Sequence, residues 1–520
     1  MLQGELLSVN GYKKNTNLQV RTKQLPLDEL AHVLELLRKQ GKRIVLCHGV
    51  FDLLHIGHIR YLRQAREHGD MLVVTVTPDK YVDKGPHRPA FTETLRAEAV
   101  ASLDCVDFVA INAWPTAENT LRMLRPDVYA KGAEFKNLED AEGKIAKENA
   151  VANEVGTEVL FVEDIVFSSS NLINQYFSSL TEDCKQYLDM FRQRYSLGTV
   201  LEYLDRMRSL NVLVVGDIIL DEYINCSPLG ASSKDPVLAV HYLSQNIFAG
   251  GSAAIANQIA QHAKTVTLCA TIGNDNKEEF IRKNLAPNVV FCPIIRDDAP
   301  TVLKQRVIVD YSFQKLLEIY HMGQSLMHKK HEDDLLSHVE YFITNHDIVV
   351  AADFGHGCIN SCIVEALCSA LFLAVNTQSN AGNRGNHTIG KYSKADFISL
   401  AHHEIEMEYR NSCLSTGEMM SDLKRRLSSH TILVTEGIQG CAVMQEDFIR
   451  APSFAVNAVD MIGAGDALFS VASLGAALDF PAEMIAFLGN ISGALAVGNI
   501  GNAKVISRQS MDKFVTAILK

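Results

Sequence analysis

The 520-residue sequence lacks a hydrophobic run long enough to cross a membrane. A transmembrane helix needs about 18 or more consecutive apolar residues. The closest stretch, Met484–Ala503, carries no charge, but asparagine, serine and glycine interrupt it, so we expect a buried helix followed by a loop. Residues 1–17 lack the apolar core of a signal peptide. These absences predict a cytoplasmic protein with no membrane partner.

Cysteine pairs of the CxxC type are also missing. The 11 cysteines are scattered, and no histidine or cysteine cluster near Cys358 and Cys362 completes a zinc site. We interpret them as reduced, mostly buried thiols of a cytosolic protein. Basic residues are in deficit, with 49 Lys and Arg against 61 Asp and Glu and a formal net charge of −12. This balance argues against a nucleic-acid partner, whereas a small phosphorylated ligand needs only a local basic pocket.

Short repeats and low-complexity segments are absent, and the chain is too long for a typical single core. Apolar runs typical of buried strands alternate with helical patterns, which predicts parallel α/β sheets. The predicted strands are residues 43–47, 71–76, 107–111, 128–130, 159–162, 211–215, 347–351, 371–375 and 431–435. We expect two α/β domains at residues 1–180 and 205–520, joined by a helical linker at residues 181–204.

A segment rich in glycine and histidine directly follows the first predicted strand and opens a helix. It comprises Gly49-Val-Phe51-Asp52-Leu-Leu-His55-Ile-Gly57-His58. Histidines three residues apart share one face of a helical turn, and helix N-termini attract phosphate. Two imidazoles there can donate hydrogen bonds to a phosphate whose charge grows in the transition state. A single histidine is more often structural, but the strand, the glycines and the histidine pair together predict a nucleotide site.

This segment matches every position of the GxFDxxHxGH signature and therefore resembles the cytidylyltransferase-like nucleotidyltransferases. The resemblance implies a Rossmann-like domain in which His55 and His58 are catalytic. It assigns nucleotide or phosphate contacts to Gly49, Phe51, Asp52 and Gly57. A sugar phosphate oxygen would attack the α-phosphorus of a nucleoside triphosphate in line and release pyrophosphate, with Mg²⁺ bridging the phosphates.

Two further parts of the first domain support this resemblance. Ser168, Ser169 and Ser170 follow the fifth predicted strand, where the family has a hydroxyl-rich turn that binds phosphate. Lys84-Gly-Pro-His-Arg88-Pro, followed by Arg96, and Lys131-Gly132 are similar to basic stretches of the heptose-phosphate adenylyltransferases. These cations would neutralise triphosphate charge. The alternatives are plain helix capping for the serines and a solvated basic loop for Lys84 and Lys131.

A second motif, Gly463-Ala464-Gly465-Asp466, precedes an apolar helix. Its main-chain N–H groups can cradle phosphate oxygens, and Asp466 can take a proton from a sugar hydroxyl. The motif resembles the DTxGAGD signature of the ribokinase-like (PfkB) carbohydrate kinases, and the resemblance extends from about residue 205 to the end. It implies an α/β sandwich and places Asn490 near the nucleotide. It assigns sugar contacts to Asp217, Asp221, Gly250, Gly251, Asn257, Lys304 and Arg306.

Several positions depart from the kinase pattern, and Met461 and Ile462 replace the hydroxyl-bearing residues that the family usually has before the glycines. Asn376-Thr-Gln378 stands where the family has Asp-Pro-Lys, and Ala401 replaces the asparagine of its NxxE metal motif. Glu404 of that motif remains and would hold Mg²⁺ indirectly. The changes remove a carboxylate, a lysine and an amide near the expected place of Mg²⁺–ATP, while the base Asp466 is retained. A kinase fold is therefore a firmer expectation than kinase activity.

Heptose enzymes of bacterial polysaccharide synthesis fuse the same two domains with the kinase first, and here the order is reversed. The resemblance implies a bifunctional enzyme that makes an ADP- or CDP-linked, heptose-like sugar from a sugar phosphate and ATP or CTP. One alternative is a nucleotidyltransferase whose kinase-like half only binds a sugar or nucleotide. Another is a non-enzymatic regulator or scaffold, which the retention of His55, His58 and Asp466 disfavours. The sequence identifies neither the sugar nor the nucleotide base, and it is compatible with a homodimer.

Overall fold

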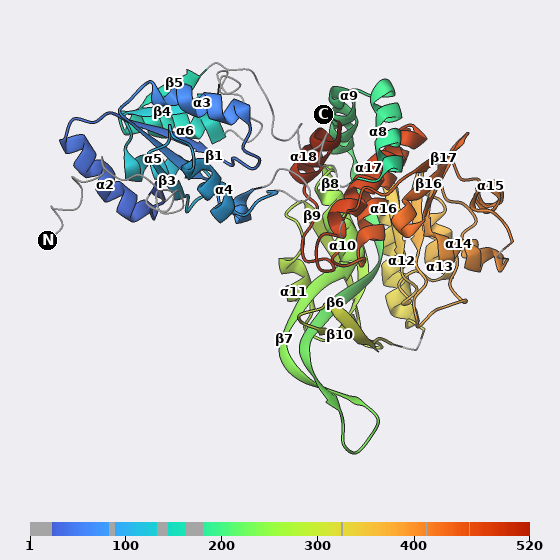
Figure 1. Ribbon diagram of the computed structural model, residues 1–520. Helices are drawn as coiled ribbons and strands as arrows, with labels where there is room; N and C mark the ends of the chain where they lie inside the picture. The colour runs from blue at the N-terminus through green and yellow to red at the C-terminus, as the bar shows by residue number, and fades with distance from the viewer. Residues whose placement is uncertain are drawn as a thin grey trace. The chain divides into compact units, whose positions relative to one another are not determined.

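The computed structural model describes residues 23–82, 89–132, 144–162, 180–323, 326–411, 413–456 and 458–519. These residues form two compact units, one within residues 1–178 and one within residues 179–519 (Figure 1). Both are α/β, as the alternating sequence pattern predicts. None of the helices in the described ranges combines the length and the apolar character needed to cross a membrane.

The first unit is built on a parallel sheet with the strand order β3-β2-β1-β4-β5. Its strands are β1 Ile44–Gly49, β2 Met71–Val76, β3 Phe108–Ile111, β4 Val128–Gly132 and β5 Glu158–Val162. The order reverses at β1, which has β2 on one side and β4 on the other. Open α/β sheets bind ligands at such a reversal, beyond the carboxyl ends of the strands.

Helices cover both faces of this sheet. They are α2 Leu27–Lys39, α3 Ile56–Arg66, η1 Asp79–Tyr81, α4 Glu93–Ala101, α5 Glu118–Leu124 and α6 Lys144–Glu154. Val45 and Cys47 of β1 share a core cluster with α3 and α4, whereas Ile44 and Leu46 share one with α2, α5 and α6. Successive side chains of a strand point to opposite faces, so a strand buried on both faces is apolar at every position. This explains why the apolar run of β1 can be recognised as a strand from the sequence alone.

The second unit has a main sheet and a smaller sheet that share the long strand β6 (Figure 1). The main sheet has the order β9-β8-β6-β12-β13-β14-β15-β16-β17, and the smaller one β11-β10-β6-β7. The strands are β6 Asn211–Ala231, β7 Leu238–Gly251, β8 Thr265–Gly273, β9 Val289–Arg296, β10 Val302–Val309, β11 Gln314–His321, β12 Ile348–Asp353, β13 Leu373–Thr377, β14 Phe397–Ala401, β15 Thr431–Thr435, β16 Cys441–Met444 and β17 Phe448–Ala451.

Strand β6 is longer than the sequence pattern predicts. The apolar run indicates a strand at residues 211–215, but β6 continues for 21 residues to Ala231. Its first part lies between β8 and β12, and its second part pairs with β10 and, antiparallel, with β7. The acidic residues Asp217 and Asp221 interrupt the apolar run, so the sequence pattern does not indicate that the strand continues beyond residue 215. The long β6–β7 hairpin projects from the rest of its unit in Figure 1.

The helices of the second unit also pack on both faces of its main sheet. They are α8 Glu182–Arg194, α9 Leu197–Arg206, η3 Met207–Ser209, α10 Ser252–Ala260, α11 Glu278–Lys283, α12 Lys329–Ile343, α13 Ser361–Leu367, η4 Ile389–Lys391, α14 His402–Tyr409, α15 Thr416–Arg426, η5 Gly437–Gln439, α16 Ala464–Ala477, α17 Ala482–Ala496 and α18 Arg508–Leu519. Val212 and Val214 of β6 share a core cluster with α10, α16 and α17, and Leu213 and Val215 share one with α12 to α15.

Two segments that the sequence pattern predicts to be helical pack in this core. The uncharged stretch expected to be a buried helix forms α17, which ends at Ala496, followed by a loop. Helices α8 and α9 occupy the segment expected to link the domains. Their residues Leu188, Phe191 and Val200 are buried in the core of the second unit.

Candidate active sites

The histidine pair follows the carboxyl end of β1, where the strand order of the first unit reverses. The sequence predicts a helix from about His58, but α3 begins at Ile56 and His55 is its N-cap residue. The Nδ1 atom of His55 accepts a hydrogen bond of 3.1 Å from the main-chain N–H of Gly57. Although His55 lies outside the helix, its ring stacks on that of His58, with centroids 4.0 Å apart.

This cap defines the tautomer of His55. A neutral imidazole has one donor and one acceptor nitrogen, and because Nδ1 accepts from Gly57, the proton resides on Nε2. Burial lowers the pKa of His55, which favours the neutral form at pH 7. Nε2 is buried and has no hydrogen-bond partner among the described residues. The site therefore presents an N–H group that can donate a hydrogen bond to a phosphate oxygen.

The loop between β1 and α3 is held by its own signature residues. Phe51 adopts a φ of 49°, in the left-handed region, and its ring contacts that of His58 edge-on at 5.3 Å. A Cβ atom on Gly49 would lie 3.2 Å from the Phe51 ring. The buried carboxylate of Asp52 accepts the main-chain N–H of Ala90. Gly49, Phe51 and Asp52 thus shape the loop that carries the histidines.

Two basic residues of the first unit bind protein groups. Arg96 is buried and donates to the carbonyl oxygens of Val50 and Thr77, which ties together the loops after β1 and β2. The Nζ atom of Lys131 lies 2.8 Å from the buried carboxylate of Glu148. Arg96 is therefore a positioning residue, and Lys131 already has a counter-charge. Lys84, Arg88, Ser168, Ser169 and Ser170 lie outside the described residues.

A cavity of about 310 Å³ lies in the second unit, where strands of the smaller sheet meet the start of α16. It brings Gly463, Gly465 and Asp466 together with four of the residues expected to contact sugar, which are Asp221, Gly251, Lys304 and Arg306. Met461 and Ile462, which directly precede the glycines of the motif, also line it, as do residues that no motif indicated, namely Ile219, Glu318, Tyr320, Phe354, Ser379, Asn380 and Asn502. The nearest sequence signal for Glu318 and Tyr320 would have been the strand β11, which the sequence pattern did not predict.

The start of α16 forms the cradle expected for phosphate. Gly463 is its N-cap residue, with a φ of 84° that glycine adopts readily, and Ala464 is its first residue. The first N–H groups of a helix have no acceptor within the helix, so they can bind an anion. A Cβ atom on Gly465 would have no neighbour within 4 Å. Gly465 therefore leaves the cavity side of the turn open.

Asp466 lies in the first turn of α16 and has the properties of a general base. Burial, and to a lesser extent the nearby Asp221 and Glu404 carboxylates, raises its pKa to about 7, and the Lys304 ammonium opposes this rise. A base whose pKa lies near the operating pH combines a populated charged form with enough basicity to accept a proton. Lys304 is itself buried, and burial lowers its pKa.

A network of charged and amide groups also lines the cavity. The Asp221 carboxylate accepts a hydrogen bond of 2.6 Å from Arg306 and one of 3.2 Å from Asn502. Arg306 also donates to Glu318 at 2.9 Å. A Cβ atom on Gly250 would lie 2.0 Å from Asp221, so glycine is needed beside this carboxylate. Fixed donors and acceptors of this kind suit the hydroxyl and phosphate groups of a sugar phosphate.

Asp460 holds the glycine turn in place. Its buried carboxylate accepts hydrogen bonds of 2.7 Å from both the Tyr223 hydroxyl and the Lys315 ammonium. It also accepts the main-chain N–H groups of Ile462 and Gly501. Asp460, three residues before Gly463, therefore connects the turn to β6 and β11.

Six residues with predicted contacts are not among the described residues that line the cavity, namely Gly250, Ala464 and the residues with the four polar side chains Asp217, Asn257, Glu404 and Asn490. Asp217 and Glu404 each accept two main-chain N–H groups, at 2.9 and 3.0 Å and at 2.7 and 2.8 Å respectively. Asn257 and Asn490 donate to main-chain carbonyl oxygens of neighbouring segments. Each of the four polar side chains is thus bonded to main-chain groups of the protein, and the ligand contacts remain predictions.

Asn376, Gln378 and Ala401, which depart from the kinase pattern, lie at or just beyond the carboxyl ends of β13 and β14. Gln378 lines the cavity, and the Asn376 amide donates to the carbonyl oxygen of Ser399 at 2.8 Å. Ala401 is the N-cap residue of α14 and offers no side-chain acceptor. Neutral amides thus occupy the place where the kinase pattern has charged groups.

Sequence models of two families match the chain. The one described as pfkB family carbohydrate kinase matches residues 209–507, and the one described as cytidylyltransferase-like matches residues 46–175. Among curated relatives, the bifunctional protein HldE of Citrifermentans bemidjiense is 38% identical over 156 residues, which cover 29% of this chain and 31% of the relative. The HldE protein of Geotalea uraniireducens is 44% identical over 111 residues, which cover 21% and 23%. The chain thus matches less than a third of the length of these relatives.

One solved structure shows the same fold as the second unit. Phosphofructokinase-2 from Escherichia coli, in its tetrameric inhibited form, matches with a TM-score of 0.50 and 14% identity. The match covers 60% of this chain and 100% of that chain. At this identity the likeness concerns the fold alone.

Proposed function

The chain belongs to the pfkB family of carbohydrate kinases, and from this membership and the two sites we propose that it is a bifunctional enzyme that makes a nucleotide-activated sugar. The second unit would phosphorylate a sugar or sugar phosphate with ATP. The first unit would transfer a nucleotidyl group from ATP or CTP to a sugar 1-phosphate and release pyrophosphate. The observation that carries the proposal is the cavity that joins the basic carboxylate of Asp466 to the Asp221–Arg306 network.

The kinase step follows from this cavity. Asp466 accepts the proton of a sugar hydroxyl, and the resulting oxygen attacks the γ-phosphorus of ATP in line, so that ADP leaves. The N–H groups at the start of α16 stabilise the charge on the transferring phosphoryl group. Lys304 and Arg306 bind the anionic groups of the sugar substrate.

The donor groups near the cavity fit a magnesium ion that arrives on the nucleotide phosphates. Glu404 already accepts two main-chain N–H groups, and a carboxylate has about four acceptor positions, so it can still accept a metal-bound water. When bound, Mg²⁺ would neutralise phosphate charge. Glu404 is then an indirect holder of the ion, as the resemblance implies.

The nucleotidyl transfer step uses the histidine pair of the first unit. An oxygen of the sugar 1-phosphate attacks the α-phosphorus of the triphosphate, and pyrophosphate leaves without a covalent enzyme intermediate. The Nε2–H group of His55 donates to a phosphate oxygen on which charge grows. His58, stacked on His55, contacts the same phosphate chain.

A substrate screen with two separate readouts tests both halves. The full chain is incubated with Mg²⁺, ATP or CTP, and a panel of sugars, sugar phosphates and sugar 1-phosphates, and ADP and pyrophosphate are measured independently. We expect substrate-dependent formation of both products. The absence of pyrophosphate with every sugar 1-phosphate and both nucleotides would refute the transferase half.

The neutral residues Asn376 and Gln378 favour a second candidate function, a kinase-like half that only binds its sugar or nucleotide. In that case the same screen yields pyrophosphate, but no sugar increases ADP formation. Calorimetry on the full chain would then still detect sugar or nucleotide binding, which Asp221→Ala should weaken.

A further inference from the structure

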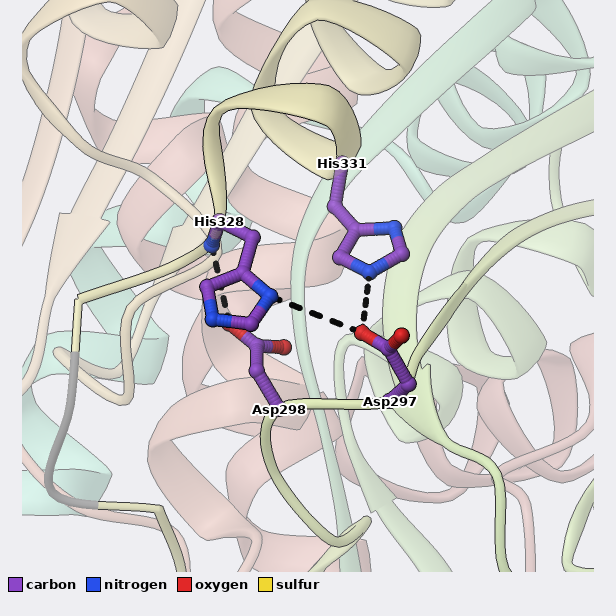
Figure 2. A group of neighbouring side chains, drawn as sticks. All are labelled: Asp297, Asp298, His328 and His331. Carbon is purple, nitrogen blue, oxygen red and sulfur yellow. Dashed lines mark hydrogen bonds and ion pairs between the residues drawn. The ribbon is translucent and has the colours of Figure 1, made fainter.

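Two aspartates and two histidines meet at a corner of the second unit, and none of the four lines the cavity that holds Asp466 (Figure 2). Asp297 and Asp298 directly follow β9, His328 is the N-cap residue of α12, and His331 lies in its first turn. One potential ligand atom from each residue lies within 4.8 Å of the others. The pairs are some 30 positions apart in the chain, so only folding brings them together.

Asp298 has a structural role in this group. Its carboxylate oxygens accept hydrogen bonds of 2.9 and 3.1 Å from the two ends of the Arg296 guanidinium. One of them also accepts the main-chain N–H of His328 at 2.8 Å. Asp298 thus neutralises Arg296 and fixes the loop against the start of α12. The three side chains that remain for a ligand are Asp297, His328 and His331.

These three side chains have the geometry of a partial metal-coordination shell. The Oδ1 atom of Asp297 lies 2.8 Å from Nε2 of His331 and 3.6 Å from Nδ1 of His328. Figure 2 shows both imidazoles directed at this one carboxylate, with nearly parallel rings 6.2 Å apart. Metal–ligand bonds of about 2.0–2.1 Å in tetrahedral geometry put the ligand atoms about 3.3 Å apart. The observed distances bracket this value, so small side-chain movements suffice.

The donor types select the kind of ion. Imidazoles bind metals in their neutral form, so among the three ligands only Asp297 would contribute a charge, while the charge of Arg296 is cancelled by Asp298. The ammonium of Lys329, which adjoins His328, is paired with Asp333 at 3.0 Å. Two nitrogens and one carboxylate oxygen suit zinc and similar divalent transition ions, whereas Mg²⁺ and Ca²⁺ prefer all-oxygen sites.

A purely structural explanation accounts for only part of the arrangement. Hydrogen bonds from a loop to a helix start explain the Asp298–His328 and Asp297–His331 contacts. They do not require the second, exposed imidazole of His328 to face the same oxygen of Asp297. The positive end of the α12 dipole disfavours a cation, and the charge of Asp297 offsets this effect. We propose that Asp297, His328 and His331 bind a divalent transition ion of the zinc type, with solvent completing its coordination.

Such an ion would connect two elements that the cavity depends on. The loop after Asp298 leads directly to β10, whose residues Lys304 and Arg306 line the cavity. The ion would clip the beginning of this segment to α12. An ion that binds only the folded chain raises its unfolding temperature, by an amount that grows with the concentration of free ion relative to its dissociation constant.

Metal binding to the full chain tests the proposal. Chelator-treated protein is dialysed at pH 7.5 against Zn²⁺, and bound metal and the unfolding temperature are measured for the wild type, the His328→Ala/His331→Ala double variant and Asp297→Asn. His338→Ala, an exposed histidine on the same helix, is the matched control. Because His55 and His58 could bind zinc as well, the difference between variants is the readout.

We expect the wild type and His338→Ala each to bind one equivalent of Zn²⁺ more than the double variant. Zn²⁺ should also raise their unfolding temperatures more than it raises that of the double variant. Mg²⁺ should produce neither difference. In Asp297→Asn the amide oxygen can still accept the His331 hydrogen bond, so this variant should fold and yet bind at least about tenfold more weakly. Equal zinc stoichiometry and equal stabilisation in the wild type and the double variant would overturn the proposal. An equal loss in His338→Ala would do the same.

Discussion

Burial acts on the two proposed catalytic groups in opposite directions. It penalises the charged form of each, so it raises the pKa of Asp466 to about 7 and lowers the pKa of His55. For His55 the neutral form is the useful one, because it carries the Nε2 proton that a phosphate oxygen can accept. For Asp466 the charged form is the useful one, because only a carboxylate accepts a proton. The two activities should therefore depend differently on pH.

The rate of ADP formation should follow the titration of Asp466. Below pH 7 the carboxylate is mostly protonated, so the rate should fall about tenfold for each further pH unit and level off above pH 7. Asp466→Asn removes the base and should lower ADP formation at least about a hundredfold. Pyrophosphate release from a supplied sugar 1-phosphate should be unchanged. Initial rates of both products from pH 5 to 9 provide the measurement.

Exposed Asp447→Asn is the control for this substitution and should alter neither product.

The pH dependence of the free energy of unfolding gives an independent check of the raised pKa of Asp466. The folded form of Asp466 binds its proton more tightly than the unfolded form, so folding loses stability as the pH rises from about 4 through 7. Asp466→Asn should therefore unfold at a higher temperature than the wild type at pH 8, and the difference should vanish towards pH 4. An unchanged difference across this range would contradict the pKa assignment.

The capping role of His55 and its proposed catalytic role can be separated by one substitution. Asparagine is a favourable N-cap residue and can still accept the N–H of Gly57, but it lacks a donor in the place of Nε2. His55→Asn should keep the unfolding temperature within a few degrees and lower pyrophosphate release at least about a hundredfold. ADP formation should persist. Wild-type pyrophosphate release by this variant would exclude a transition-state role for His55.

Both sites are built on the start of a helix that follows a turn. In the first unit the side chain of His55 caps α3, and in the second unit Gly463 caps α16 without a side chain. Main-chain N–H groups at such positions attract phosphate in either case. The elements thus supply main-chain donors that can bind an anion, and under the proposed function the neighbouring side chains determine which reaction takes place there.

The two glycines of the α16 turn should respond differently to alanine. At Gly465 a Cβ atom meets nothing within 4 Å, and alanine is the better helix residue by about 1 kcal/mol, so Gly465→Ala should retain or raise the unfolding temperature. Its methyl group enters the cavity and should lower ADP formation. At Gly463, with a φ of 84°, alanine is strained and lies 2.6 Å from Asn502, so Gly463→Ala should lower the unfolding temperature.

Thermal unfolding and product assays on the two variants distinguish these effects. A Gly465→Ala protein with normal ADP formation would show that this turn does not hold the phosphoryl group. A Gly463→Ala protein as stable as the wild type would contradict the strained conformation of the cap.

At the scale of the whole molecule, each proposed activity has a core of its own. The buried residues of the first unit and those of the second belong to separate clusters. Helices α8 and α9 belong to the second of these cores, through Leu188, Phe191 and Val200. A domain cut at residue 205 would therefore lose part of its own core.

Fragments of the chain test this division. Residues 1–180 alone should be soluble and should release pyrophosphate. Residues 180–520 should unfold in one cooperative transition, whereas residues 205–520 should be far less stable, because removing α8 and α9 exposes apolar residues such as Phe487 that pack against Phe191. Soluble yield and unfolding temperature are the measurements. Equal stability of the two longer fragments would show that α8 and α9 are only a linker.

The sequence by itself determined the features that depend on neighbours along the chain. The run at β1 is apolar throughout because both faces of that strand are buried, and the histidine and glycine motifs are short segments whose spacing carries their chemistry. Only the tertiary structure decided that β6 continues to Ala231, that Glu318 faces Arg306, and that Asp297 meets His331. These pairings depend on strand order and register between segments far apart in the chain. No local pattern encodes that order, because burial and hydrogen bonding are satisfied by the folded chain as a whole.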